Sequence, residues 1–186
     1  MKTTTFIENY FDNIKKLFRY YKSLGDRTFA QLSEQEVFHS ADEYSNSIAV
    51  ITKHISGNMI SRFTDFLTSD GEKPCRNREM EFQNSFETKE QVLAYWEKGW
   101  ACVFNAIDPL TIEEANKIVY IRNEGHSILE ALNRQLGHYS YHIGQIVFLG
   151  KTLKGKDWQS LSIPVGQSTT FNSEKFGKEK SRKNFV

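Results

Sequence analysis

Two histidines lie four residues apart in the segment "GHYSYHIGQIVFLGK" at residues 137–151. If this segment is helical, His138 and His142 project from one face of the helix, about 6 Å apart along its axis. HExxH helices hold a zinc ion with the same spacing. The residues between the two histidines are Tyr-Ser-Tyr and include no glutamate, so the pattern favours metal binding but excludes an HExxH metalloprotease. The alternative is a solvated polar helix face that contains two histidines.

A catalytic zinc site usually takes three protein ligands, so the pair needs a third. His54 is the best candidate because it lies within another helical segment, although alone it would be interpreted as a core or edge histidine. His126 would point about 120° away from His138 and is a poor partner. Glu36 and His39 have the ExxH spacing of di-iron bundles, but such sites need two of these motifs and two more glutamates.

Polar residues extend the histidine stripe in both directions. Arg134 precedes His138 by four residues, and Gln145 follows His142 by three. Either side chain is a candidate to bind the carboxylate of a substrate or to orient a bound water. A shift of one residue in the helix phase would exchange these roles, so the sequence leaves open which of Arg134, Gln135 and Gln145 faces the metal.

Hydrophobic periodicity predicts the elements that position these residues. Apolar residues recur every three or four positions in four long segments, which predicts helices at 4–24, 42–68, 88–106 and 124–153. The capping-box spacing of Ser33 and Glu36 predicts a short helix at 33–39. The β-prone run "KIVYIRNEG" at 117–125 predicts an extended segment or a small hairpin.

Glycines mark two further features of the predicted helices. Gly25 is expected to end the first helix. Gly137 and Gly144 lie inside the last one, where each costs up to about 1 kcal/mol of helix propensity. We expect them to allow a close approach to the helix backbone.

Four long amphipathic helices indicate an all-α protein, a four-helix bundle with a small extended segment before the last helix and a C-terminal extension. The length of 186 residues suits one domain, which we expect at 1–165, with the extension at 166–186. The stretch from residue 156 to residue 172 should pack onto the bundle through Trp158, Leu161, Ile163 and Phe171. The basic end of the extension is expected to be mobile.

Composition excludes several classes of function. Lys and Arg number 24 and Asp and Glu number 23, so the net charge of +1 gives no general attraction to nucleic acid. A nucleic-acid or membrane role of the basic last thirteen residues is a minor alternative. Cys75 and Cys102 form no CxxC motif and are expected to be reduced. The sequence shows neither a signal peptide nor the roughly 18 apolar residues of a membrane span, so we expect a cytoplasmic protein.

The segments "ITKHISGNMISRFTDFLTSDGEK", "IVYIRNEGHSILEALNRQ" and "NRQLGHYSYHIGQIVFLGK" resemble the DinB/YfiT-like superfamily, and within it a Bacillus-type branch known only as a domain of unknown function. The resemblance covers most of the chain, and both histidine segments match in order. It implies a four-helix bundle with a metal held by three histidines, one from the second helix and two from the last. In this sequence these are His54, His138 and His142. It also implies a homodimer.

The resemblance further implies a reaction. Three neutral imidazoles suit Zn²⁺ or Ni²⁺ and leave a coordination position open. Some members of the superfamily are S-transferases that use the thiol bacillithiol, so the expected activity is attack of a small-molecule thiol on an electrophile. Two alternatives stay open. One is a metal-dependent hydrolase with Asp65 or Glu124 as general base. The other is a non-catalytic, stress-related bundle protein in which the metal only stabilises the fold. Such a structural metal site would need a fourth protein ligand.

Overall fold

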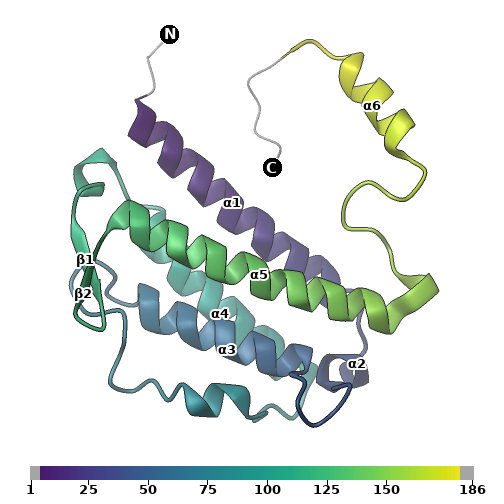
Figure 1. Cartoon of the computed structure of the whole chain (residues 1–186), viewed down its shortest axis with the longest axis horizontal. Helices are drawn as coiled ribbons and strands as arrows, with labels where there is room; N and C mark the ends of the chain where they lie inside the picture. The colour runs from purple at the N-terminus through teal and green to yellow at the C-terminus, as the bar shows by residue number, and fades with distance from the viewer. Residues whose placement is uncertain (1–4, 181–186) are drawn as a thin grey trace.

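The computed structural model describes residues 5–180 of the chain, in which helices predominate. The four long helices are α1 (Phe6–Phe29), α3 (Ile48–Phe63), α4 (Lys89–Ile107) and α5 (Ile128–Lys154). Figure 1 shows α1 and α5 side by side, with α3 and α4 beneath them. Helix α3 packs against both α4 and α5, and α1 packs mainly against α5. The predicted all-α class agrees with this arrangement.

Shorter elements connect and extend the long helices. They are α2 (Glu34–Phe38), the 3₁₀ helices η1 (Glu79–Phe82), η2 (Ile112–Glu114) and η3 (Gly155–Asp157), the strands β1 (Ile118–Ile121) and β2 (Glu124–Ser127), and α6 (Ser168–Phe176). The strands pair antiparallel, with Ile121 opposite Glu124, so the predicted extended segment is a hairpin. Its two turn residues, Arg122 and Asn123, have φ values of 56° and 63°, in the left-handed region.

Local capping explains where most helices begin. Ser33 and Glu36 form the predicted capping box of α2, and the Thr88 side chain accepts the backbone N–H of Gln91 at the start of α4. Several predicted boundaries are wrong. The helix predicted at 42–68 is α3, which begins only at Ile48 and ends at Phe63. Gly25 lies inside α1, where it packs against the Trp96 ring instead of ending the helix. Residues 124–127 form β2, because Ser127 and Glu130 make the capping box that starts α5.

The core of the molecule is built around α3. All of its residues are buried except Lys53 and Ile60. A helix that is enclosed on all sides has no solvated face. The polar side that carries His54 and Asn58 is therefore buried too, beneath the connection between α3 and α4 and beside α5. Aromatic rings from the other helices fill the centre. The ring centroids of Phe18, Trp100 and Tyr139 lie within 6.4 Å of one another.

The expected close approach at Gly137 and Gly144 is wrong. A Cβ atom added to either residue would meet no heavy atom within 4 Å. The close contact on α5 is instead at Gly150, where a Cβ atom would lie 2.6 Å from Cγ2 of Thr28 on α1. Gly150, and not the earlier glycines, allows the ends of these two helices to pack closely.

The segment that follows α5 is attached to the end of α1 more loosely than predicted. Arg27 donates to the carbonyl of Leu161, and Gln31 exchanges two hydrogen bonds with the backbone of Gln159. Ile163 and Phe171 nevertheless remain 38% and 39% exposed, and α6 buries no residue. Residues 181–186 of the predicted mobile basic end lie outside the described residues. No helix within residues 5–180 combines the length and hydropathy of a membrane span.

The contrast between the glycines of α5 is testable. Because Gly144 has open space around it, we expect Gly144→Ala to raise the free energy of unfolding by about 0.5–1 kcal/mol. Gly150→Ala should lower it by about 1–3 kcal/mol, since the added methyl group would overlap Thr28. Urea denaturation of the full chain in the presence of a chelator measures both values. Destabilisation by Gly144→Ala would show that the space beside this glycine is needed.

Candidate metal centre

The structure brings the three histidines together across two helices. His54 lies in the middle of α3, and His138 and His142 lie on adjacent turns of α5. Their ring centroids are 4.9 to 5.4 Å apart, and one ring nitrogen of each lies within 4.8 Å of the others. In a tetrahedral zinc site such nitrogen atoms are about 3.3 Å apart. Binding therefore requires the distances between these nitrogen atoms to shorten by up to about 1.5 Å. Small side-chain rotations can provide this change.

His54 is oriented by a buried carboxylate. Its Nδ1 atom lies 3.0 Å from Oε2 of Glu81, a residue that is only 6% exposed. Burial by itself raises the pKa of Glu81, but the hydrogen bonds from His54 and Arg76 outweigh this effect and lower it overall. An ionised carboxylate can only accept a hydrogen bond, so Nδ1 of His54 carries the proton. Its Nε2 atom is then the ring nitrogen that remains to ligate a metal.

His142 is held in the same tautomer by a different partner. Its Nδ1 atom donates to Oε1 of Gln145 over 2.8 Å. Its Nε2 atom is buried and has no hydrogen-bond partner. A buried ring nitrogen without a partner is costly, and a metal ligated by this atom would remove the cost.

Burial also keeps the imidazoles of His138 and His142 neutral. It lowers the pKa of His138 to about 3, and repulsion from His142 and His54 contributes further. Burial lowers the pKa of His142 to about 4, although the hydrogen bond to Gln145 opposes the change. Neutral imidazoles are the form that ligates metals. The three histidines thus fit a metal ion in ligand type and orientation, and His138 and His142 also fit it in protonation state.

Packing around the histidines fixes their positions. Gly57 leaves room for Glu81, because a Cβ atom at this position would lie 2.6 Å from the carboxylate oxygen Oε1. The ring of Phe82 stacks on His54 with centroids 4.7 Å apart, and Tyr141 lies against His142 at 4.1 Å. The helical turn η1 thus supplies both the carboxylate and a covering ring.

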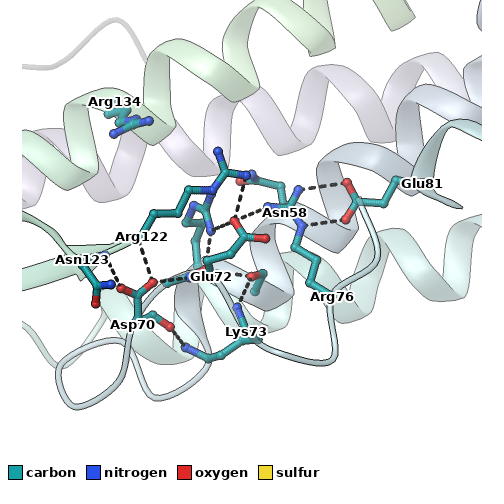
Figure 2. A network of polar contacts seen from close by, with 12 residues as sticks. Asn58, Asp70, Glu72, Lys73, Arg76, Glu81, Arg122, Asn123 and Arg134 are labelled. Atoms are coloured by element: carbon teal, nitrogen blue, oxygen red, sulfur yellow. Dashed lines mark hydrogen bonds and ion pairs between the residues drawn. The ribbon is translucent and has the colours of Figure 1, made fainter. Parts of the chain in front are cut away.

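A pocket of about 250 Å³ opens beside the cluster. His54 and His138 form part of its wall, and the other residues around it are polar or aromatic: Asn58, Arg62, Arg76, Arg78, Arg122, Arg134, Gln135 and Tyr141. Figure 2 shows the polar network on one side of this pocket, in which Arg76 bonds Glu81 and Arg122 lies next to Asp70 and Glu72.

The structure separates the three polar candidates on α5. Arg134 is exposed at the pocket and donates to Nε2 of His126, while Gln135 is buried in the pocket wall. Gln145 lies behind His142 and does not line the pocket, so its role is to position that histidine. Asp65 and Glu124, the candidate general bases, are absent from the pocket wall.

Sequence reasoning missed the residues contributed by the loop after α3 and by the hairpin. Glu81, Arg76 and Arg122 have no periodic relation to the histidines and come from segments predicted as irregular or extended. The available signal was the density of charge in "CRNREMEF" at residues 75–82, directly after the His54 helix.

The pKa values predict how stability depends on pH. In the unfolded chain a histidine takes up its proton near pH 6.5, whereas His138 and His142 stay neutral in the folded protein to about pH 4. Between these limits the unfolded chain binds more protons. The metal-free protein therefore has its full stability above about pH 6.5 and loses it as the pH falls, by up to about 1.4 kcal/mol per pH unit for each histidine.

Urea denaturation of chelator-treated protein between about pH 7.5 and pH 5 would measure this slope. His138→Gln should make it shallower. His39→Gln, which changes an exposed histidine outside the cluster, should leave it unchanged. Equal slopes in the wild type and in His138→Gln would contradict the assigned burial of a neutral imidazole.

Comparison with known proteins places the chain in a family. Residues 5–167 match a family described as "Protein of unknown function (DUF1572)", and this range includes all three histidines and the pocket. No curated protein and no solved structure gave a match. The match covers most of the 186 residues, and the chain therefore belongs to this family of proteins of unknown function.

Proposed function

We propose that the protein binds one divalent metal ion through His54, His138 and His142 and uses it to activate a small-molecule thiol for attack on an electrophile. The observation that carries the proposal is the buried Nε2 atom of His142, which has no partner and converges with two other histidines. Zn²⁺ or Ni²⁺ is the proposed metal, because neutral imidazoles suit both.

The resemblance to DinB-type proteins supports the same reading. In this chain the candidate ligands lie on the second and the last of the four long helices, in the order that the resemblance implies. We propose that α1, α3, α4 and α5 form a bundle of this type. Its relevance to the site is that α3 and α5 lie in direct contact and present their histidines to one another.

The residues of the chain have distinct parts in the proposed chemistry. A metal held here would supply an open coordination position and lower the pKa of a thiol that occupied it. Glu81 and Gln145 keep the Nδ1 protons of His54 and His142 in place, so that the opposite nitrogens remain free. Phe82 and Tyr141 cover the imidazole rings, and the pocket provides space for a reactant beside them.

The surroundings of the cluster favour thiol chemistry over the two alternatives. Hydrolysis needs a general base, and the pocket wall contains no carboxylate. A purely structural site is normally closed by four ligands. Among residues 5–180, the cluster consists of three histidines without a fourth Cys, Asp or Glu.

Metal analysis of the purified full chain tests the proposal. We expect about one metal ion per chain in the wild type and its loss in His54→Ala and His142→Ala, since three ligands from two helices are needed. His39→Ala is the matched control and should retain the metal. Metal binding that survives His54→Ala would overturn the site.

The thiol step needs a separate readout. Addition of a small thiol to the Co²⁺-loaded protein should produce a near-ultraviolet sulfur-to-metal charge-transfer band and should precede transfer to a model electrophile. If Co²⁺ binds but neither a band nor transfer appears with any thiol, the metal site stands and the proposed reaction is wrong.

The positioning role of Gln145 gives a finer test. Gln145→Leu should weaken metal affinity about tenfold to a hundredfold, because Nδ1 of His142 loses its acceptor. Gln145→Glu keeps an acceptor and should retain wild-type affinity. Competition with a chromophoric chelator measures both. Because the residue is exposed, unfolding of the metal-free variants should match the wild type, and equal affinities for Gln145→Leu and Gln145→Glu would contradict the role.

A further inference from the structure

The pocket beside the histidines is rich in arginine. Five of the ten residues that line it are arginines, and none is a carboxylate. They come from α3, from the α3–α4 loop, from the hairpin turn and from α5, so the fold gathers them from four separate segments: Arg62, Arg76 and Arg78, Arg122, and Arg134. Like charges brought together from distant segments need a compensating charge.

Two of these arginines are buried and already neutralised. Arg76 donates to both carboxylate oxygens of Glu81 at 2.8 and 2.9 Å, and its side chain is 5% exposed. Arg62 donates to the carbonyl of Gly71 and to Oε2 of Glu72. Glu72 is shared, because the same oxygen also lies within 3.3 Å of Arg76 and Arg122. The negative charges of Glu72 and Glu81 therefore balance the positive charges of the two buried arginines, Arg62 and Arg76, and little positive charge beyond these.

The arginines at the rim lack such partners. Arg134 has one hydrogen-bond partner among the described residues, the ring of His126, and in Figure 2 it stands apart from the bonded network. Arg122 is 59% exposed and reaches only the shared oxygen of Glu72, at 3.2 Å. Arg78 is 52% exposed and lies 3.7 Å from the highly exposed Glu79. The rim thus carries uncompensated positive charge that faces the pocket.

The backbone holds one of these arginines in place at a cost. Arg122 has a left-handed φ of 56°, a conformation that favours glycine, asparagine or aspartate over arginine. The Asp70 carboxylate accepts the backbone N–H groups of Arg122 and Asn123 at 2.9 and 2.8 Å and fixes the turn. An arginine kept in an unfavourable turn position, clamped from another segment, is consistent with a functional guanidinium.

A buried amide supplies a second, independent sign of a ligand. Gln135 is 4% exposed, lies in the pocket wall, and has a buried amide oxygen without a hydrogen-bond partner. Buried amide groups are normally satisfied. A bound molecule with a hydroxyl or amine group could satisfy this atom while an anionic group meets the arginines.

We propose that this pocket binds a small substrate carrying oxyanion groups, a dicarboxylate or a phosphate, through Arg122 and Arg134 at its rim. Guanidinium groups bind both anions with paired, charge-assisted hydrogen bonds. The cavity of about 250 Å³ limits the substrate to a small molecule. The inference deepens the proposed function, on which it rests for the reaction at the histidines, by naming the charge that one reactant carries.

Calorimetric titration of the full chain tests the proposal with malonate and inorganic phosphate as probes and neutral malonamide as control. The protein is titrated both with chelator and with Zn²⁺, and metal affinity is measured for every variant. Arg122→Gly removes the guanidinium and suits the left-handed turn, so the hairpin should stay folded. Arg134→Gln is the second variant. Lys151→Gln is the matched control. It removes a positive charge from an exposed position on α5 that lies about 25 Å from Arg134 along the helix axis.

We expect wild type and Lys151→Gln to bind at least one anion equally, and malonamide not to bind. Each arginine variant should bind the anion about tenfold more weakly, the effect of losing one charge-assisted contact, while retaining its metal affinity. The tighter of the two anions identifies the oxyanion class. Wild-type anion affinity in both arginine variants, equal binding of malonamide, or no anion binding would overturn the inference. Anion binding by a chain that fails to bind Zn²⁺ when the metal is supplied would overturn the proposed function and leave the inference standing.

Discussion

Glu81 keeps a negative charge in the interior, between the guanidinium of Arg76 and the imidazole of His54. A carboxylate in this position costs several kcal/mol of desolvation unless its lone pairs are satisfied by charged or polar donors. That requirement explains much of the surrounding structure. The α3–α4 connection must fold back along α3, Arg76 must be buried with the carboxylate, and residue 57 must be a glycine so that the carboxylate can reach His54.

The centre and the pocket beside it have opposing electrostatic effects on a cation. Arg62 and Arg76 contribute to lowering the pKa of His138, which keeps its imidazole neutral and ready to act as a ligand. The same positive charges repel a divalent ion. Glu72 and Glu81 offset part of this repulsion, and an anion in the pocket would offset the rest. Metal and anion should thus reinforce one another, and the coupling is reciprocal by thermodynamic necessity.

Sequence patterns predicted the parts of the molecule that rest on local rules. The spacing of His138 and His142, the capping box at Ser33 and the four apolar stripes each depend on residues within a few turns of one another, and the structure contains the corresponding elements. The start of α5 was misplaced because residues 124–127 pair with β1, which periodicity does not report. The arginine pocket was missed because its residues come from four segments that only the tertiary fold brings together.

The three histidines are close in space and distant in the chain, with about 88 residues between His54 and His142. Closing a loop of this length in an unfolded chain costs roughly 4–5 kcal/mol of chain entropy at room temperature. Packing of α3 against α5 meets this cost before any ligand arrives, so the folded chain presents a preassembled chelate that the unfolded chain lacks. A metal would consequently act on this protein much as a long-range crosslink does, by selecting the folded state over the unfolded ensemble.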